Sequence, residues 1–253
     1  MNAEEKQSWA KNCLILIPAF NEEEVLTSLV GEVRRYFPET PVLVVNDGSL
    51  DRTAAVARQA GAIVLDLPCN LGVGGAVQAG FQYALAKGYS CVVRIDGDGQ
   101  HPPEEIGKLL EAMASTGADL IVGSRFELTD GCVSSRGRYL GIKALAFFLS
   151  LICRSRVTDP TSGFWALNRP LLSYFSRSYP ADYPEPEALA LLRRQGYSFA
   201  EVPVRFRVRQ GGRSTIRSWG AFYYALKVGL ALVVDRVRPI NPLFDRSRVV
   251  TKT

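Results

Sequence analysis

Two acidic side chains separated by one glycine, Asp96 and Asp98, are the strongest chemical signal in the sequence. They follow directly on residues 91–93, an apolar run typical of a buried strand. Carboxylates at the exit of a strand can turn towards one point, and Gln100 could add a third oxygen. Mg²⁺ and Mn²⁺ take oxygen ligands and commonly keep one or two protein carboxylates plus phosphate oxygens. The stretch therefore predicts a metal site that holds a diphosphate, against the alternative of a loop that only turns the chain.

The elements that must position these acids alternate along the chain. Apolar runs typical of buried strands occupy residues 13–17, 41–45, 62–65, 91–95 and 120–122. Helical patterns occupy residues 21–36, 53–60, 76–87, 103–115 and 182–196. This alternation predicts an α/β fold, with a mostly parallel sheet and helices on both faces.

Ligands of such sheets bind outside the carboxyl ends of the strands. Four polar or glycine-rich clusters fall at the predicted ends, at residues 18–22, 46–49, 70–75 and 96–100. Turns are polar by default, but turn chemistry alone does not require an acid in these clusters. Their convergence on one edge indicates a binding site.

The composition restricts the class of protein. A chain of 253 residues that is 47% hydrophobic can bury one substantial core. Its five cysteines are odd in number and scattered, which is typical of buried thiols in a reducing cytosol. Residues 1–11 are polar and lack the pattern of a secretory signal. His101 is the sole histidine, so the chemistry does not depend on a histidine triad or a histidine-rich zinc site.

The charge is unevenly distributed along the chain. From Arg193 onward there are 13 lysine or arginine residues against three acids, whereas the remainder is acidic overall. A basic segment can meet nucleic acid, anionic lipid or a phosphorylated substrate, and charge alone does not choose among them.

Six motifs stand in order along the chain: Ile-Pro-Ala-Phe-Asn-Glu at 17–22, Val-Val-Asn-Asp-Gly-Ser-Leu-Asp-Arg-Thr at 44–53, Asn-Leu-Gly-Val-Gly-Gly-Ala at 70–76, Asp-Gly-Asp-Gly-Gln-His-Pro-Pro-Glu at 96–104, Gly-Ser-Arg-Phe at 123–126 and Asp-Pro-Thr-Ser-Gly-Phe at 159–164. Together they resemble the inverting family 2 glycosyltransferases of GT-A fold, most closely the dolichyl-phosphate mannose synthase-like branch. The resemblance implies a GT-A domain at residues 13–215. A polar extension at 1–12, an amphipathic helix at 216–240 and a basic tail at 241–253 would flank it.

The resemblance also assigns roles at the donor side. It implies that the nucleotide-sugar is bound by Pro18, Phe20, Glu22, Asp47, Asn70 and Asp96. It places Mg²⁺ or Mn²⁺ on Asp98 and Gln100, with Asp96 beside them, and turns Arg125 towards a phosphate. A surface arginine is the alternative for Arg125. Asn70 and glycines 72–75 form either a substrate-facing loop or only a tight helix entry.

The catalytic base is the open question at the acceptor side. In many relatives an acidic motif about eleven residues before a glycine supplies it, and counting back from Gly196 leads to Glu185. Here Pro-Glu-Pro-Glu at 184–187 replaces the usual Glu-Asp pair, so Glu185, Glu187 or neither would act, and simple helix capping is the alternative. A sugar hydroxyl acceptor needs a base, whereas a phosphate acceptor is already anionic.

The basic C-terminal part suggests contacts with phosphates and with a membrane. We expect the acceptor phosphate to meet Arg125, Arg136, Arg209, Arg213 and Ser214. Residues 219–234 form an apolar run too short for the ~20 residues that span a bilayer. With aromatic residues at one end and arginines at both, the run suggests a helix in the interface near anionic headgroups; a core or dimer helix is the alternative.

These observations predict a metal-dependent inverting glycosyltransferase, peripheral on the cytosolic face of a membrane, that moves a sugar from a UDP- or GDP-sugar to a polyisoprenyl phosphate. The rival within the same class transfers to a sugar hydroxyl of a lipid-linked or polysaccharide acceptor, with Glu185 as base. A basic nucleic-acid- or membrane-binding protein is the non-enzymatic alternative, but it does not explain Asp96 and Asp98, and nucleic acid is not an expected partner. A homo-oligomer or a small membrane-protein partner is compatible with the sequence.

Overall fold

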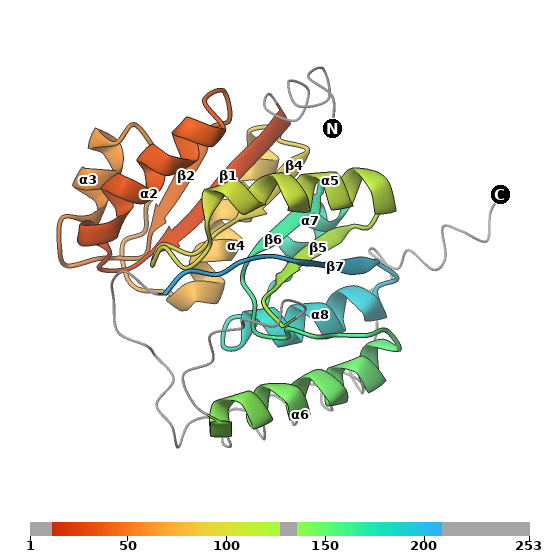
Figure 1. Ribbon diagram of the computed structural model, residues 1–253. Coiled ribbons are helices and arrows are strands. Elements are labelled where there is room, and N and C mark those ends of the chain that lie inside the picture. The colour runs from red at the N-terminus through yellow and green to blue at the C-terminus, as the bar shows by residue number, and fades with distance from the viewer. Residues whose placement is uncertain (1–11, 127–135, 209–253) are drawn as a thin grey trace.

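The computed structural model describes residues 12–126 and 136–208, with only the backbone for 136–138. Its described residues form one seven-stranded sheet in the order β3-β2-β1-β4-β6-β5-β7 (Figure 1). The strands are β1 (Cys13–Ala19), β2 (Val42–Asn46), β3 (Ile63–Asp66), β4 (Cys91–Arg94), β5 (Leu120–Ser124), β6 (Trp165–Asn168) and β7 (Phe199–Pro203). All neighbouring pairs are parallel except those of β6, which is antiparallel to β4 and β5. The mostly parallel sheet predicted from the sequence is confirmed.

Helices cover both faces of the sheet, as predicted (Figure 1). They are α2 (Glu23–Tyr36), α3 (Thr53–Gln59), α4 (Gly72–Ala86), α5 (Ile106–Thr116), α6 (Arg136–Cys153), α7 (Arg169–Phe175) and α8 (Pro184–Arg194), with a 3₁₀ turn η1 (Pro103–Glu105) before α5. Side chains alternate along β1, so that Leu14 and Leu16 pack with α4, α7 and α8, whereas Ile15 and Ile17 pack with α2 and α5. Helix α6 packs on α8.

The antiparallel strand β6 is the main feature that the sequence pattern does not reveal. Trp165 pairs with Arg94 at the end of β4 and with Val122 near the end of β5. Because β6 runs against its neighbours, it begins at the edge where they end. The segment 159–164, which leads into β6, therefore lies at the carboxyl edge of the sheet, beside the acidic motif.

Two of the expected elements differ in detail. The strand predicted at 62–65 is the partly exposed edge strand β3, because only β2 pairs with it. Helix α4 begins at Gly72, so the glycines expected before the helix form its first turn. A Cβ on Gly74 would lie 2.3 Å from the carbonyl oxygen of Pro180, which explains this glycine by tight packing.

Several expectations lie outside the described residues. These are the N-terminal extension up to residue 11, the helix at 216–240, the tail at 241–253, and Arg209, Arg213 and Ser214. The side chain of Arg136 is also outside them. Among the described cysteines, all are free; Cys13, Cys91 and Cys153 are buried, and Cys69 is exposed. None of the helices in the described ranges combines the length and the apolar character that crossing a membrane requires.

Candidate active site

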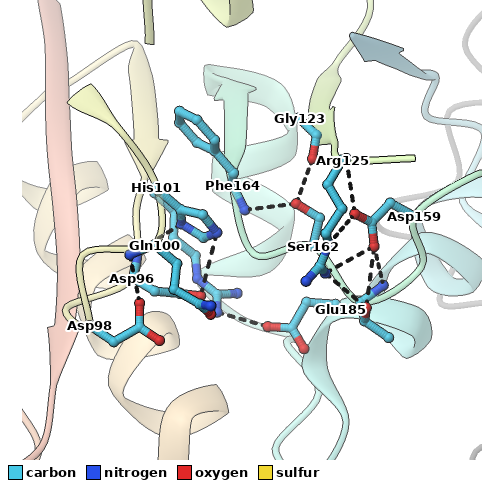
Figure 2. A network of polar contacts seen from close by, with 12 residues as sticks. Asp96, Asp98, Gln100, His101, Gly123, Arg125, Asp159, Ser162, Phe164 and Glu185 are labelled. Carbon is cyan, nitrogen blue, oxygen red and sulfur yellow. Dashed lines mark hydrogen bonds and ion pairs between the residues drawn. The ribbon is translucent and has the colours of Figure 1, made fainter. Parts of the chain in front are cut away.

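Four segments bring polar side chains together at the carboxyl edge of the sheet. Asp96, Asp98 and Gln100 follow β4, Arg125 follows β5, residues 159–164 precede β6, and Glu185 stands in the first turn of α8. Figure 2 shows these side chains in one network, with Asp96 between Asp98 and Glu185. Of the four clusters predicted to converge, 96–100 is part of this network, and the clusters at 18–22, 46–49 and 70–75 reach the same edge through contacts of Asp47 with Ala19 and Leu71 and of Gly97 with Pro18.

Asp96 is held by buried groups on two sides. Its Oδ1 accepts a 3.1 Å hydrogen bond from Nη2 of Arg94, and its Oδ2 lies 3.8 Å from Nε2 of His101. Its backbone N–H donates to Nδ1 of His101 at 2.9 Å, which leaves the histidine proton on Nε2. Burial would raise the pKa of Asp96, but His101, Arg94 and Arg125 outweigh it and hold the pKa below its usual value.

His101 forms the packed wall behind this carboxylate. Its ring stacks on Phe164 with centroids 4.9 Å apart, and Phe206 meets it edge-on at 5.0 Å. Burial lowers the pKa of His101 to about 4, against the opposing effect of Asp96. The histidine is thus neutral near pH 7 and acts as a rigid aromatic support.

Asp98 and Gln100 supply the oxygen groups best suited to a cation. Oδ1 of buried Asp98 accepts the backbone N–H of Gln100 at 3.0 Å, which fixes the loop, whereas Asp96 is turned towards Arg94 and His101. Within residues 12–126 and 136–208, no three His, Cys, Asp or Glu side chains form a cluster able to hold a metal. One carboxylate and one amide oxygen fit Mg²⁺ or Mn²⁺, which take their remaining ligands from phosphate and water.

Arg94 is the site residue that sequence reasoning missed. It is fully buried on β4, where Nη2 donates to Glu185 Oε1 at 2.7 Å as well as to Asp96, and Nη1 donates to Tyr179 Oη at 3.3 Å. Burial would lower the pKa of Arg94, but Glu185 and Asp96 raise it above the usual value. A charged residue inside an apolar strand was the available signal, because a buried charge needs a partner.

Arg125 is not a surface arginine, since it forms a buried fork with Asp159. Its Nε donates to Asp159 Oδ2 at 2.7 Å, and its Nη2 donates to Asp159 Oδ1 at 3.1 Å and to Thr161 Oγ1 at 3.0 Å. The guanidinium carbon lies 4.8 Å from the centroid of the Phe206 ring. Nη1 is not used in these contacts, so the side chain can keep this pair and still meet a phosphate.

Three residues of the segment 159–164 each make a specific structural contact. Glu201 of β7 accepts the backbone N–H of Asp159 at 3.1 Å, and Ser162 Oγ donates to the carbonyl oxygen of Gly123 at 2.6 Å. A Cβ on Gly163 would lie 2.8 Å from Arg94 Nη2, so only glycine leaves room for this arginine. The segment therefore supports the site through its contacts with β5, β7 and Arg94.

Asp47, expected to bind the nucleoside, has a structural contact of its own. It is buried, and its Oδ1 accepts the backbone N–H of Leu71 at 2.7 Å. Gly48 adopts φ +68°, and a Cβ there would lie 2.7 Å from the carbonyl carbon of Cys69. Asp47 and Gly48 thus hold the loop after β2 against the loop after β3.

The other expected donor residues lie around the end of β1. Pro18 is buried, and its carbonyl oxygen would lie 3.0 Å from a Cβ on Gly97. The backbone N–H of Glu22 donates to Thr53 Oγ1. Phe20 and Asn70 are exposed, and Asn70 Oδ1 accepts the N–H of Gly72 at 3.0 Å.

Glu185 points to Arg94 and does not cap its helix with its side chain. The side chain of Tyr183, the N-cap residue of α8, makes no capping hydrogen bond, and the Glu185 side chain is 15% exposed. Glu187 lies two residues further along α8 and is partly buried. Its backbone N–H donates to the carbonyl oxygen of Tyr183 at 3.3 Å.

Comparison with known proteins gives a consistent picture. A model of glycosyl transferase family 2 matches residues 14–175. The polyprenol monophosphomannose synthase of Mycolicibacterium smegmatis is 32% identical over 241 residues, which cover 90% of each chain. The undecaprenyl-phosphate mannosyltransferase of Micrococcus luteus is 32% identical over 209 residues, which cover 80% of each.

A solved structure has the same architecture. The glucosyl-3-phosphoglycerate synthase of Mycobacterium tuberculosis, crystallised with Mn²⁺, uridine-diphosphate-glucose and phosphoglyceric acid, matches with a TM-score of 0.70 and 21% identity. The match covers 92% of this chain and 83% of the other. At this identity the likeness concerns the fold, and it confirms the expected GT-A architecture.

Proposed function

We propose, from the premise that this chain belongs to glycosyl transferase family 2, that it moves a sugar from a nucleotide-sugar to a polyisoprenyl phosphate. The protein is a glycosyltransferase. The observation that carries the proposal is the gathering of Asp96, Asp98 and Arg125 at one sheet edge, where carboxylates and an arginine can meet the two ends of a diphosphate.

The donor would lie along the carboxyl ends of β1, β2 and β4. Asp98 and Gln100 would hold Mg²⁺ or Mn²⁺, which when bound neutralises the charge that develops on the leaving nucleoside diphosphate. Exposed Phe20 and Asn70 would contact the nucleoside, while buried Asp47 keeps their loops in place. Asp96, partly exposed above Arg94 and His101, would accept a hydrogen bond from the ribose.

A phosphate acceptor is favoured over a sugar hydroxyl by the contact of Glu185 with Arg94. A hydroxyl must lose its proton to a base as it attacks, whereas an ionised phosphate oxygen attacks the anomeric carbon directly and expels the diphosphate with inversion. Glu185, the candidate base, instead accepts a hydrogen bond from the buried Arg94. Arg125 would orient the acceptor phosphate through its planar guanidinium.

The first prediction concerns donor binding. In the presence of Mn²⁺, one of UDP, GDP, TDP and CDP should raise the melting temperature of the purified protein, because a ligand of the native state stabilises it by mass action. The rise should shrink when Mn²⁺ is replaced by a chelator. A thermal-shift screen measures both effects, and the absence of a rise with all four nucleotides would contradict the proposed function.

The second prediction concerns the membrane. Helix α6 exposes Leu140, Phe147 and Leu151 along one stripe at 67%, 76% and 70%, with exposed Lys143 and Arg154 nearby, as a helix that meets anionic lipid would. Replacing Phe147 and Leu151 by serine should weaken binding to anionic vesicles at least about tenfold, since each buried apolar side chain contributes about 1.5–3 kcal/mol.

Co-sedimentation with vesicles measures this binding. The matched control is Tyr36→Ser, which removes a 49% exposed aromatic ring at the last residue of α2, at the opposite end of the strands from the site. The control should bind vesicles as the unmodified protein does. Equal binding by the α6 variant would place the membrane contact elsewhere on the protein.

A further inference from the structure

Arg94 stands between the donor edge and helix α8. Its side chain is 1% exposed, yet it contacts Asp96, which is 34% exposed, and Glu185, which is 15% exposed. Asp96 and Glu185 are 89 positions apart in the sequence and share the same guanidinium nitrogen, Nη2. Arg94 therefore holds these two acids together through hydrogen bonds from one nitrogen.

The surroundings of Arg94 are built to hold it in one position. The guanidinium lies 5.6 Å from the centroid of the Trp165 ring, and Tyr179 Oη accepts from Nη1. On another side, a Cβ on Gly163 would approach Arg94 Nη2 to 2.8 Å and Asp96 Oδ1 to 3.0 Å. The guanidinium is thus confined to one position by the Trp165 ring, the Tyr179 hydroxyl and the space that Gly163 leaves open.

From this geometry we infer that Arg94 is a positioning residue, which fixes the carboxylate of Asp96 for the nucleotide-sugar and uses Glu185 as its counter-ion. The partly exposed side of Asp96 faces the site, while Arg94 and His101 hold the carboxylate from behind. Glu185 balances the charge of Arg94, so its contribution is to the placement of Asp96. This inference rests on the proposed function, because the ligand positioned by Asp96 is the donor.

A test must separate lost positioning from lost stability. Removing Arg94 alone leaves Asp96 and the largely buried Glu185 without their shared cation, which can unfold the protein. The double variant R94M/E185M removes the arginine together with its counter-ion and keeps similar side-chain volumes, a change that buried ion pairs often tolerate. The comparison variant E185Q keeps an oxygen for Arg94 and leaves the contact between Arg94 and Asp96 in place.

Isothermal titration with UDP and with GDP, each with Mn²⁺, measures nucleotide affinity, and thermal denaturation measures the fold. We expect R94M/E185M to bind its nucleotide at least roughly tenfold more weakly than the unmodified protein, the loss that follows from one misplaced hydrogen bond to a charged group. The loss for E185Q should be several times smaller. In transfer assays the KM for the donor should rise, whereas the KM for the acceptor should change little.

Each other outcome has a definite meaning. Unchanged nucleotide affinity in a folded R94M/E185M variant would overturn the inference alone. A loss in E185Q as large as in the double variant would also overturn it, since Glu185 would then act on the ligand itself. If the unmodified protein binds neither nucleotide, the proposed function fails for these donors, and the inference fails with it.

Discussion

Replacement of Asp98 by alanine is expected to abolish metal-dependent transfer while the protein stays folded. Asp98 is the carboxylate best placed for the cation, because Asp96 is already turned to Arg94 and His101. A bound cation contributes several kcal/mol of charge stabilisation to the leaving diphosphate, so initial rates should fall by at least about a hundredfold. The hydrogen bond that the fold loses from the Gln100 backbone is worth about 1 kcal/mol.

The measurement that identifies the cause is the rise in melting temperature with Mn²⁺ and nucleotide, which should disappear in the Asp98→Ala variant. Asp119→Asn is a matched control, because Asp119 is equally buried but lies at the start of β5, where it accepts from Asn168 and Ser198. The control should retain the response to Mn²⁺ even if its melting temperature is lower. An Asp98→Ala variant that transfers as fast as the unmodified protein would rule out the metal assignment.

The sequence was sufficient to predict strands β1 to β5, because each of them lies in an apolar run, whereas the parallel edge strand β7, which carries Glu201, was not predicted. β4 and β5 are buried on both faces, so their residues carry a signal that does not depend on their partners. β6 has only four residues, and its antiparallel direction depends on pairing with Arg94 and Val122. The sequence pattern of so short a segment does not specify whether it runs parallel or antiparallel to its neighbours.

The same limit explains which site residues were predicted. Asp96 and Asp98 stand at a strand end, a position that local pattern reveals. The partners of Arg94 and Arg125 come from α8 and from the segment before β6, brought near by the antiparallel strand. The charge of Arg94 within an apolar run was a signal that the sequence analysis did not use, and only the tertiary structure shows that Glu185 is its partner.

Removal of the Arg125 side chain should strongly destabilise the protein. Asp159 is fully buried and accepts both Nε and Nη2 of this arginine. Arg125→Met leaves the carboxylate buried without its cation, which we expect to lower the free energy of unfolding by about 3–5 kcal/mol. Chemical denaturation of the variant and of the unmodified protein measures the difference.

The paired variant R125M/D159L separates the structural role of Arg125 from its proposed role with phosphate. Replacing both charges by apolar side chains of similar size is often neutral for stability, so most of the loss should be regained. Transfer should nevertheless stay at least about tenfold below the unmodified rate, because the phosphate then lacks a hydrogen bond from a charged group. Full recovery of both stability and transfer would mean that Arg125 serves only to neutralise Asp159, and the acceptor phosphate would have to be bound by other cations.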